Sequence, residues 1–239
     1  QGVEQLERIV AHLSEKEEIR WIRLQYLFPD RRVLELLKLW EKYPKLVPYL
    51  DIPFQHVSPE ILKAMKRPSD TALFGEIMDQ ARNISPDFEI RTSFIVGFPG
   101  ETEAHYNDLV NFIKTHRIDK LALFRYSHEA GTSAGDQLAE TVSDEEKYRR
   151  INELRDIHLE TRKQYALGLM GRTETMIVDE VNAGEVTLRR AHDAPESDEI
   201  VTAPLPGSLK LQPGDMPQVT IKAYTEYSFL GEIKRPTDV

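Results

Sequence analysis

The sequence predicts an α/β fold, namely a partial, open barrel of parallel strands followed by a small all-β antiparallel barrel. Over residues 1–142, four apolar strand-like runs alternate with helical runs, and this alternation implies parallel crossovers. A long charged helix is expected over 143–168 as a connecting element. From residue 169 to 239 the pattern changes to short alternating runs between turns, which is typical of a small β-barrel.

Apolar spacing and turn residues place the elements of residues 1–142. Val33, Leu36, Leu37 and Trp40 follow a helical period. Ser58 precedes Pro59, a pair typical of a helix start. Strands are expected over 20–27, 49–54, 89–96 and 120–126, and helices over 4–13, 31–43, from 59, 71–83 and 102–115. Four strands are few for a closed barrel, which commonly has about eight, so the sheet is either open or incomplete.

The remainder of the chain divides into one helix and about five strands. Ser143 stands three residues before Glu146, a spacing that predicts a capping box at the start of the long helix. Strands are expected over 173–178, 185–190, 200–203, 218–224 and 227–233.

Composition excludes several classes of protein. With 40% apolar and 30% charged residues in a chain of 239, the sequence is that of an ordinary globular protein. No apolar run reaches the ~18 residues of a membrane span and no signal-peptide pattern opens the chain, so we expect a cytoplasmic location and no membrane contact. The absence of cysteine excludes disulfides and thiolate ligation of metals or iron–sulfur clusters within the chain.

The segment 91–103 suggests a ligand site. An apolar run ends at Gly97, Pro99 and Gly100 turn the chain, and acidic residues open a helix. Polar or glycine-rich endings also follow the strands at Gln55 and at residues 124–132. Because the carboxyl ends of parallel strands share one edge, these endings together predict a pocket for a small, partly apolar and partly charged ligand.

Five segments of the chain resemble one enzyme family in collinear order. They are WIRLQYLFPD, PYLDIPFQHVSPEILKAMKR, RTSFIVGFPGETE, FRYSHEAGTSA and DAPESD. They strongly resemble the radical S-adenosylmethionine (SAM) methylthiotransferases. The resemblance covers nearly the whole chain and implies a partial radical SAM barrel followed by a TRAM domain, a small β-barrel that holds the substrate.

Two branches of this family differ in substrate. One modifies adenosine in transfer RNA, and the RimO type methylthiolates the β-carbon of an aspartate in a small-subunit ribosomal protein. The run from Asp193 to Glu196 resembles the RimO-type TRAM pattern, although Leu188, Ser197 and Glu199 depart from it. Residues 171–239 hold 7 Lys and Arg against 12 Asp and Glu. This acidity favours a basic ribosomal protein as partner and makes RNA binding less likely.

The resemblance also implies cofactors. Enzymes of this family use S-adenosylmethionine and two [4Fe-4S] clusters, one of them held by a C-x-x-x-C-x-x-C loop. The chain has no cysteine, so we expect a C-terminal fragment that ligates neither cluster, carries no catalytic or metal-binding residue and is inactive alone.

The resemblance assigns residues to two sites. The wall of the cofactor pocket is expected from Gln55, Arg91, Gly97, Phe98, Pro99 and Tyr126. Gly97 would allow close backbone approach, Phe98 and Tyr126 would face adenine, and Arg91 or Gln55 would hold the methionine carboxylate. In the TRAM domain, substrate contact is expected from Arg189, Asp193 and Glu196.

The sequence is compatible with two alternatives. A transfer-RNA methylthiotransferase would bind RNA in a salt-dependent manner. A non-catalytic adaptor would be a natural barrel without an iron–sulfur cluster that binds a partner through the small β-barrel of residues 169–239.

Overall fold

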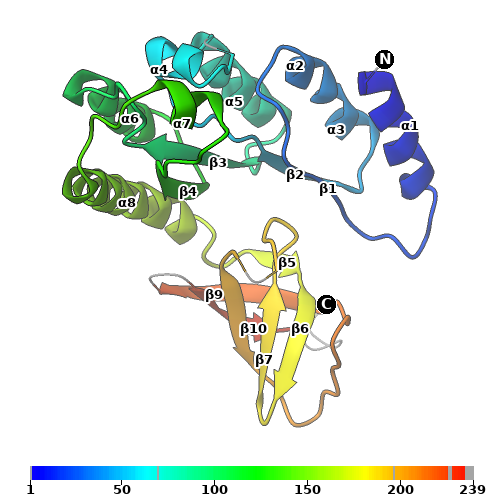
Figure 1. Cartoon of the computed structure of the whole chain (residues 1–239). Coiled ribbons are helices and arrows are strands. Elements are labelled where there is room, and N and C mark those ends of the chain that lie inside the picture. The colour runs from blue at the N-terminus through cyan, green and yellow to red at the C-terminus, as the bar shows by residue number, and fades with distance from the viewer. Residues whose placement is uncertain (1, 69, 196, 226–227, 235–239) are drawn as a thin grey trace. The chain divides into compact units, whose positions relative to one another are not determined.

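The chain folds into two compact units, Gln1–Thr161 and Arg162–Val239 (Figure 1). The structure is a computed structural model that describes residues 2–68, 70–195, 197–225 and 228–234. Each unit has its own hydrophobic core.

The first unit contains a four-stranded, wholly parallel sheet. Its strands lie in the order β1 (Ile22–Leu24), β2 (Leu46–Asp51), β3 (Glu89–Val96) and β4 (Lys120–Arg125). The predicted open parallel sheet is therefore confirmed, and β3 has the predicted bounds. The strand expected over 49–54 lies earlier in the chain; its ladder is interrupted at Phe54, whose N–H donates to the Thr92 hydroxyl and not to a backbone carbonyl.

The helices agree with the expected pattern except at two places. They are α1 (Gly2–Ser14), α2 (Arg32–Leu36), α3 (Lys38–Lys42), α4 (Pro59–Ala64), α5 (Ala72–Ile84), α6 (Glu103–Thr115), α7 (Ser133–Gln137) and α8 (Asp144–Leu167). The single helix expected over 31–43 is broken at Leu37 into α2 and α3. The short helix α7 was not expected; the Thr132 side chain caps it by accepting from the Gly135 N–H.

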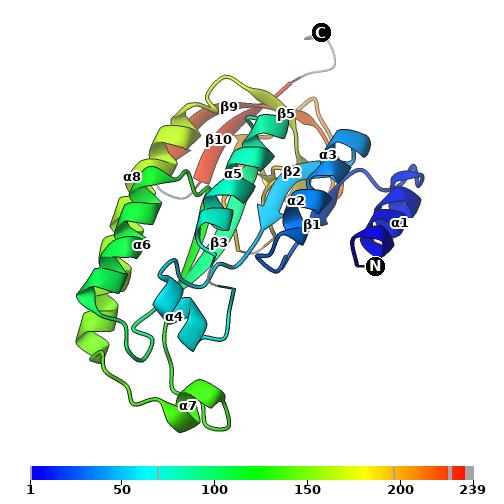
Figure 2. The same cartoon turned by 90° about the horizontal axis from the view of Figure 1, so that it is seen from above.

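Helices cover one face of this sheet. Ile90, Phe94 and Val96 of β3 are fully buried in the core, whereas Arg91 and Ile95 on the alternate positions are partly exposed. Phe54 stacks on Phe74 of α5 with ring centroids 4.1 Å apart. Viewed from above, α4 and α7 lie beyond the carboxyl ends of β2 and β4, the strands that precede them (Figure 2).

The second unit is a curled six-stranded sheet. Its strands, β5 (Thr173–Thr175), β6 (Ile177–Asn182), β7 (Glu185–Arg189), β8 (Ile200–Pro204), β9 (Gln218–Thr225) and β10 (Ser228–Ile233), lie in the order β5-β9-β10-β8-β7-β6. Hydrogen bonds from Met176 N to Pro217 O (3.0 Å) and from Val178 N to Asp215 O (2.8 Å) continue the pairing where β5 passes into β6.

One strand pair in this unit differs from the expected antiparallel barrel. β8 and β10 pair in parallel, whereas the other pairs are antiparallel. The reason is the connection over 205–217, which reverses the direction of the chain, so that β9 runs opposite to β8. Since β9 and β10 then form an antiparallel pair, β10 runs in the direction of β8.

Two kinds of feature are absent from the described parts of the chain. No helix there is long and apolar enough to cross a membrane. No group of three or more His, Asp and Glu side chains there is arranged to hold a metal ion.

A tight contact at Gly231 yields a stability prediction for the second unit. A Cβ at this position would lie 2.6 Å from Val219 Cγ1 and 3.0 Å from Val201 Cγ1. We expect Gly231→Ala to lower the free energy of unfolding by about 1–3 kcal/mol, because added volume in a packed core forces side chains out of their rotamers. Urea unfolding measures the change. Gly207→Ala, with no atom within 4 Å, is the control and should stay within about 0.5 kcal/mol of wild type. Equal effects would contradict the packing argument.

Candidate functional site

Three successive strands of the parallel sheet are followed by residues in the left-handed backbone region. Tyr26 (φ 57°) follows β1, Gln55 (φ 71°) follows β2 and Gly97 (φ 77°) follows β3. For residues other than glycine this conformation costs about 1–2 kcal/mol. Such strain gathers at binding and catalytic sites, and the ends of parallel strands share one edge. This edge is therefore the candidate site.

Gln55 is held at this edge by backbone bonds alone. Its N–H donates to Ser93 O and its carbonyl accepts from Ile95 N, each at 2.8 Å. These bonds fix Gln55 beside Phe94 in a parallel bridge. Its partly exposed side-chain amide makes no hydrogen bond to any residue that the structure describes. The amide is thus positioned and available for a ligand.

The turn after β3 closes on a buried carboxylate. Gly97 N donates to Glu101 Oε2 at 2.9 Å, and Glu101 N donates to Phe98 O at 2.8 Å. Thr102 then caps α6 in a capping box with His105. The expected turn and helix start are therefore present, and Glu101 ties the two together.

Glu101 has two further neighbours. Arg150 Nη1 of α8 donates to Glu101 Oε1 at 2.6 Å, and His56 Nε2 lies 3.6 Å from Glu101 Oε2. The side chains of Glu101 and His56 are fully buried and that of Arg150 is 6% exposed. His56 Nδ1 accepts from Ser58 N, so a neutral His56 carries its proton on Nε2, toward the carboxylate.

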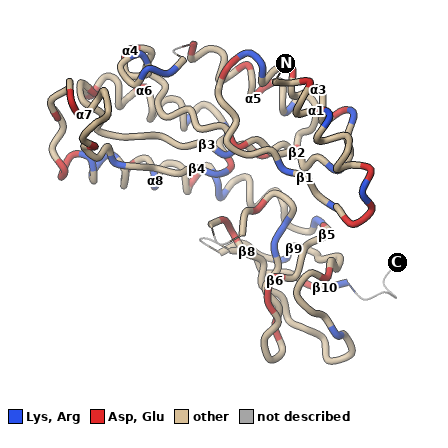
Figure 3. The backbone as a smooth tube through the Cα atoms, turned by 45° about the vertical axis from the view of Figure 1, so that its right-hand side comes forward, with Lys and Arg blue, Asp and Glu red and all other residues tan. Residues whose placement is uncertain are grey.

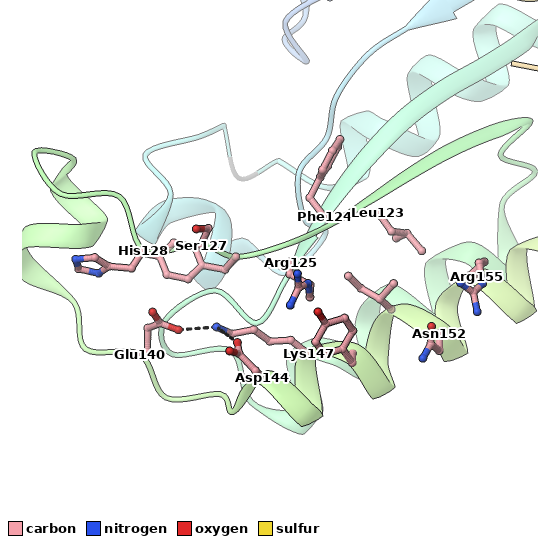
Figure 4. A pocket seen from close by; sticks show the side chains of 13 residues that line it. Leu123, Phe124, Arg125, Ser127, His128, Glu140, Asp144, Lys147, Asn152 and Arg155 are labelled. Carbon is pink, nitrogen blue, oxygen red and sulfur yellow. Dashed lines mark hydrogen bonds and ion pairs between the residues drawn. The ribbon is translucent and has the colours of Figure 1, made fainter. Parts of the chain in front are cut away.

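Lys147 of α8 packs directly against Gly97. A Cβ on Gly97 would lie 2.3 Å from Lys147 Cγ, so the lysine stem fills the space that any other side chain would need. Its ammonium group extends to Glu140 and Asp144 (Figure 4). Burial works against the charged form, but hydrogen bonds to these two carboxylates outweigh it and raise the pKa of Lys147.

Phe98 and Tyr126 meet at the same turn. Their ring centroids lie 5.2 Å apart at 75°, and Tyr126 N donates to Val96 O. Phe98 is only 5% exposed, so its ring supports Tyr126 instead of presenting a free face. The Tyr126 hydroxyl is buried without a hydrogen-bond partner among the described residues, a polar atom available to a ligand.

A cavity of about 630 Å³ opens beside Tyr126, between the end of β4 and α8 (Figure 4). The Arg125 guanidinium in this cavity lies 3.9 Å from the centroid of the Tyr148 ring, a stacking contact. Phe124 and Tyr148 are both about half exposed, at 55% and 51%. The cavity therefore extends the candidate site from the end of β4 along α8.

The beginning of α8 is stabilised by ion pairs. Ser143 Oγ accepts from Glu146 N at 3.2 Å, which is one half of the predicted capping box. The Glu146 carboxylate instead pairs with Arg149 and Arg150, and hydrogen bonds from Arg149, then Arg150, lower its pKa to about 2. Figure 3 shows acidic and basic residues interspersed along this helix.

The structure brings five of the six residues expected at the cofactor pocket to one edge of the sheet. Gly97, Phe98 and Pro99 form the turn, and Tyr126 packs on it. Gln55 follows β2 and forms an isolated parallel bridge opposite Phe94.

Arg91 does not lie at the rim of the sheet, the edge at the carboxyl ends of the strands where Gln55, the turn after β3 and Tyr126 are found. It is in register with Asp51 and Lys120 and precedes Val96 by five residues. At ~3.3 Å per residue, this places it roughly 16 Å down the strand from the turn.

Of the three residues expected to contact the substrate, two have partners within the protein and one lies outside the described residues. Arg189 donates to both carboxylate oxygens of Asp179, at 2.9 and 3.0 Å. Asp193 is fully buried, and its N–H donates to Arg190 O. Glu196 lies outside the described residues.

Several residues of the site carried no sequence signal. Tyr26 is recognisable only by its backbone angle, since nothing in its residue type predicts a left-handed conformation. Lys147 and Arg150 belong to a helix some fifty residues beyond the turn, and in sequence they resemble any basic pair at helical spacing. Glu101 gave a weak signal, as an acid at a helix start.

Two family models match the chain. The Radical SAM superfamily model matches residues 3–113, and the TRAM domain model matches residues 170–233. The first match includes strands β1 to β3 of the parallel sheet, and the second includes the curled sheet.

Several curated relatives carry the name ribosomal protein uS12 methylthiotransferase RimO. The protein from Leptospira biflexa is 40% identical over 81% of this chain and 43% of its own length. That from Hydrogenovibrio crunogenus is 40% identical over 87% of the chain and 45% of its length, and that from Klebsiella pneumoniae 38% over 88% and 47%. The chain thus spans a little under half the length of the curated relatives it matches.

A solved structure supports the fold. Coproporphyrinogen III oxidase (HemN) from Escherichia coli, described as a radical SAM enzyme, matches with a TM-score of 0.56 and 18% identity. The match covers 66% of this chain and 37% of that one. At this identity the similarity concerns the fold alone.

The contact between Gly97 and Lys147 gives a prediction with a matched control. Gly97→Ala combines left-handed strain with the overlap on Lys147, whereas Gly100→Ala (φ 88°) meets no atom within 4 Å. We expect Gly100→Ala to cost about 1–2 kcal/mol in unfolding free energy, and Gly97→Ala about 1–3 kcal/mol more. Denaturant unfolding of both variants checks this. Adding Lys147→Ala should recover part of the extra loss at Gly97; no recovery would refute the packing role of Lys147.

The lowered pKa of Glu146 predicts a pH dependence. Because the folded pKa of about 2 lies below the ordinary value of 4.5, Glu146 contributes stability above pH 4.5 that is lost as the pH falls toward 2. Glu146→Gln should therefore lower the Tm at pH 7 and differ progressively less from wild type toward pH 3. Thermal scans across this range measure the gap, and a gap independent of pH would contradict the assignment.

Proposed function

The chain belongs to the radical SAM methylthiotransferase family, and we propose that it carries the cofactor rim and TRAM domain of a RimO-type enzyme. The proposed reaction adds a methylthio group to the β-carbon of an aspartate in a small-subunit ribosomal protein. The observation that carries this proposal is the 36–40% identity to RimO proteins over 81–89% of the chain.

We propose that S-adenosylmethionine contacts the rim described above. The Gln55 amide and the Tyr126 hydroxyl are polar groups without partners among the described residues, and the Tyr126 ring packs on Phe98 of the turn. This combination suits a ligand with an aromatic base and a charged amino-acid end. When bound and reduced, S-adenosylmethionine supplies a carbon radical, which is needed because the β-C–H bond of aspartate is strong and not acidic. The residues of this chain bind and orient the cofactor.

The residues of this chain do not fit an iron–sulfur cluster. Such clusters are held by cysteine thiolates, and the chain contains no cysteine. The two [4Fe-4S] clusters that the family resemblance implies would need ligands that this sequence does not supply.

We propose that the second unit receives the ribosomal protein. Residues 171–239 contain 7 basic and 12 acidic residues, and opposite charge speeds and orients association with a basic protein. Arg189 and Glu196 remain the proposed contacts, whereas the fully buried Asp193 would hold the loop that carries them and would not touch the partner. Because Arg189 is paired with Asp179, it would act as part of a charge pair and not as a lone cation.

The experiment that tests the function uses the cluster-loaded enzyme that contains this chain. Incubated with S-adenosylmethionine, a sulfur source and reductant, it should add one methylthio group to an aspartate of purified uS12, detected by mass spectrometry. Transfer RNA is offered in parallel. Modification of adenosine in the transfer RNA, with uS12 unchanged, would replace the proposal by the other branch of the family. Failure to bind S-adenosylmethionine at all would support the adaptor alternative.

Gln55→Ala tests the cofactor rim. It should weaken S-adenosylmethionine binding about tenfold or more, because a hydrogen bond to a charged group contributes roughly 1.5–3 kcal/mol. Equilibrium binding measures the Kd. The control, Gln80→Ala, removes an exposed amide from α5 and should leave the Kd unchanged. An unchanged Kd for Gln55→Ala would remove this residue from the site.

A further inference from the structure

Two basic residues of α8 contact the turn after β3 from the same side of the helix. Lys147 and Arg150 are three positions apart, which places them on one face. Their side chains are 2% and 6% exposed, and both reach the turn Gly97–Glu101. A lysine and an arginine this deeply buried are uncommon unless paired.

Lys147 acts on the turn by shape. Its Cγ, Cδ and Cε would lie 2.3, 2.9 and 3.0 Å from a Cβ on Gly97, so three consecutive methylene groups run across the glycine. The ammonium group is held beyond the turn by Glu140 and Asp144. With both ends fixed, the stem leaves the backbone at Gly97 no room to shift toward α8.

Arg150 acts on the turn by charge. It donates to Glu101 Oε1 at 2.6 Å, while Glu101 Oε2 accepts the Gly97 N–H at 2.9 Å. Each carboxylate oxygen therefore has a different partner, one on the helix and one on the turn. Loss of Arg150 would leave a buried carboxylate without its counter-ion, and the carboxylate would be free to leave the Gly97 N–H.

The adjacent residue on α8 offers a natural comparison. Arg149 pairs with Glu146 and Glu153, and its side chain is 48% exposed. It shares Glu146 and Glu103 with Arg150 but makes no bond to Glu101.

We propose that Lys147 and Arg150 are positioning residues for the cofactor: they set the conformation of the Gly97–Glu101 turn, and through it the affinity for S-adenosylmethionine. Neither residue needs to touch the cofactor. This inference rests on the proposed function, because it takes the ligand at the rim to be S-adenosylmethionine.

The test compares Arg150→Gln with Arg149→Gln in the cluster-loaded enzyme that contains this chain. Each variant is assayed for its Kd for S-adenosylmethionine and for its Tm, with binding measured well below the lower Tm. We expect Arg150→Gln to raise the Kd about tenfold or more, since small displacements of a binding group have effects of up to ~100-fold. Arg149→Gln should leave the Kd unchanged, and Arg150→Lys should recover part of the affinity.

A second variant covers the case in which Arg150→Gln does not fold. Lys147→Met keeps an unbranched stem on Gly97 and removes the charge, whereas Lys147→Ala removes the stem. We expect the Lys147→Met variant to bind S-adenosylmethionine more tightly than the Lys147→Ala variant.

The outcomes separate the two proposals. A lower Tm with an unchanged Kd in Arg150→Gln would make the pair purely structural and overturn the inference. If the wild-type protein does not bind S-adenosylmethionine, the proposed function itself fails.

Discussion

The candidate site depends on one buried carboxylate. Glu101 accepts the Gly97 N–H with one oxygen and the Arg150 guanidinium with the other, so a strand end, a helix start and a distant helix meet at a single group. Removing one partner of such a pair typically costs about 3–5 kcal/mol, because the remaining charge stays buried. The left-handed turn, the packing of Phe98 on Tyr126 and the start of α6 all follow from where this carboxylate is held.

Much of the fold could be predicted because the signals for it are local. The strand β3 has the predicted bounds since its apolar residues end at a glycine, and α6 begins where a threonine can cap it. The break at Leu37 and the parallel pairing of β8 with β10 were not predictable in this way. Both depend on packing and on chain connections that no short window of sequence contains.

The site was less predictable than the fold, for a geometric reason. A strand spaces its residues ~3.3 Å apart, so Arg91 and Gly97 belong to one motif in sequence but to opposite ends of β3 in space. Conversely, Arg150 is distant in sequence but lies 2.6 Å from Glu101. A sequence motif predicts where the strand ends. It does not predict which side chains from other helices and strands lie beside that end.

The two glycines of the turn, Gly97 and Gly100, have different roles in the structure. Gly97 was expected to let a ligand approach the backbone, yet the space left by its missing side chain is filled by Lys147. Gly100, also in the left-handed region, has no atom within 4 Å of where a Cβ would stand. One glycine thus admits a supporting side chain from within the protein, and the other leaves the turn open. An internal contact that requires glycine fixes the backbone on one side, so a ligand on the other side meets a turn whose shape is already set.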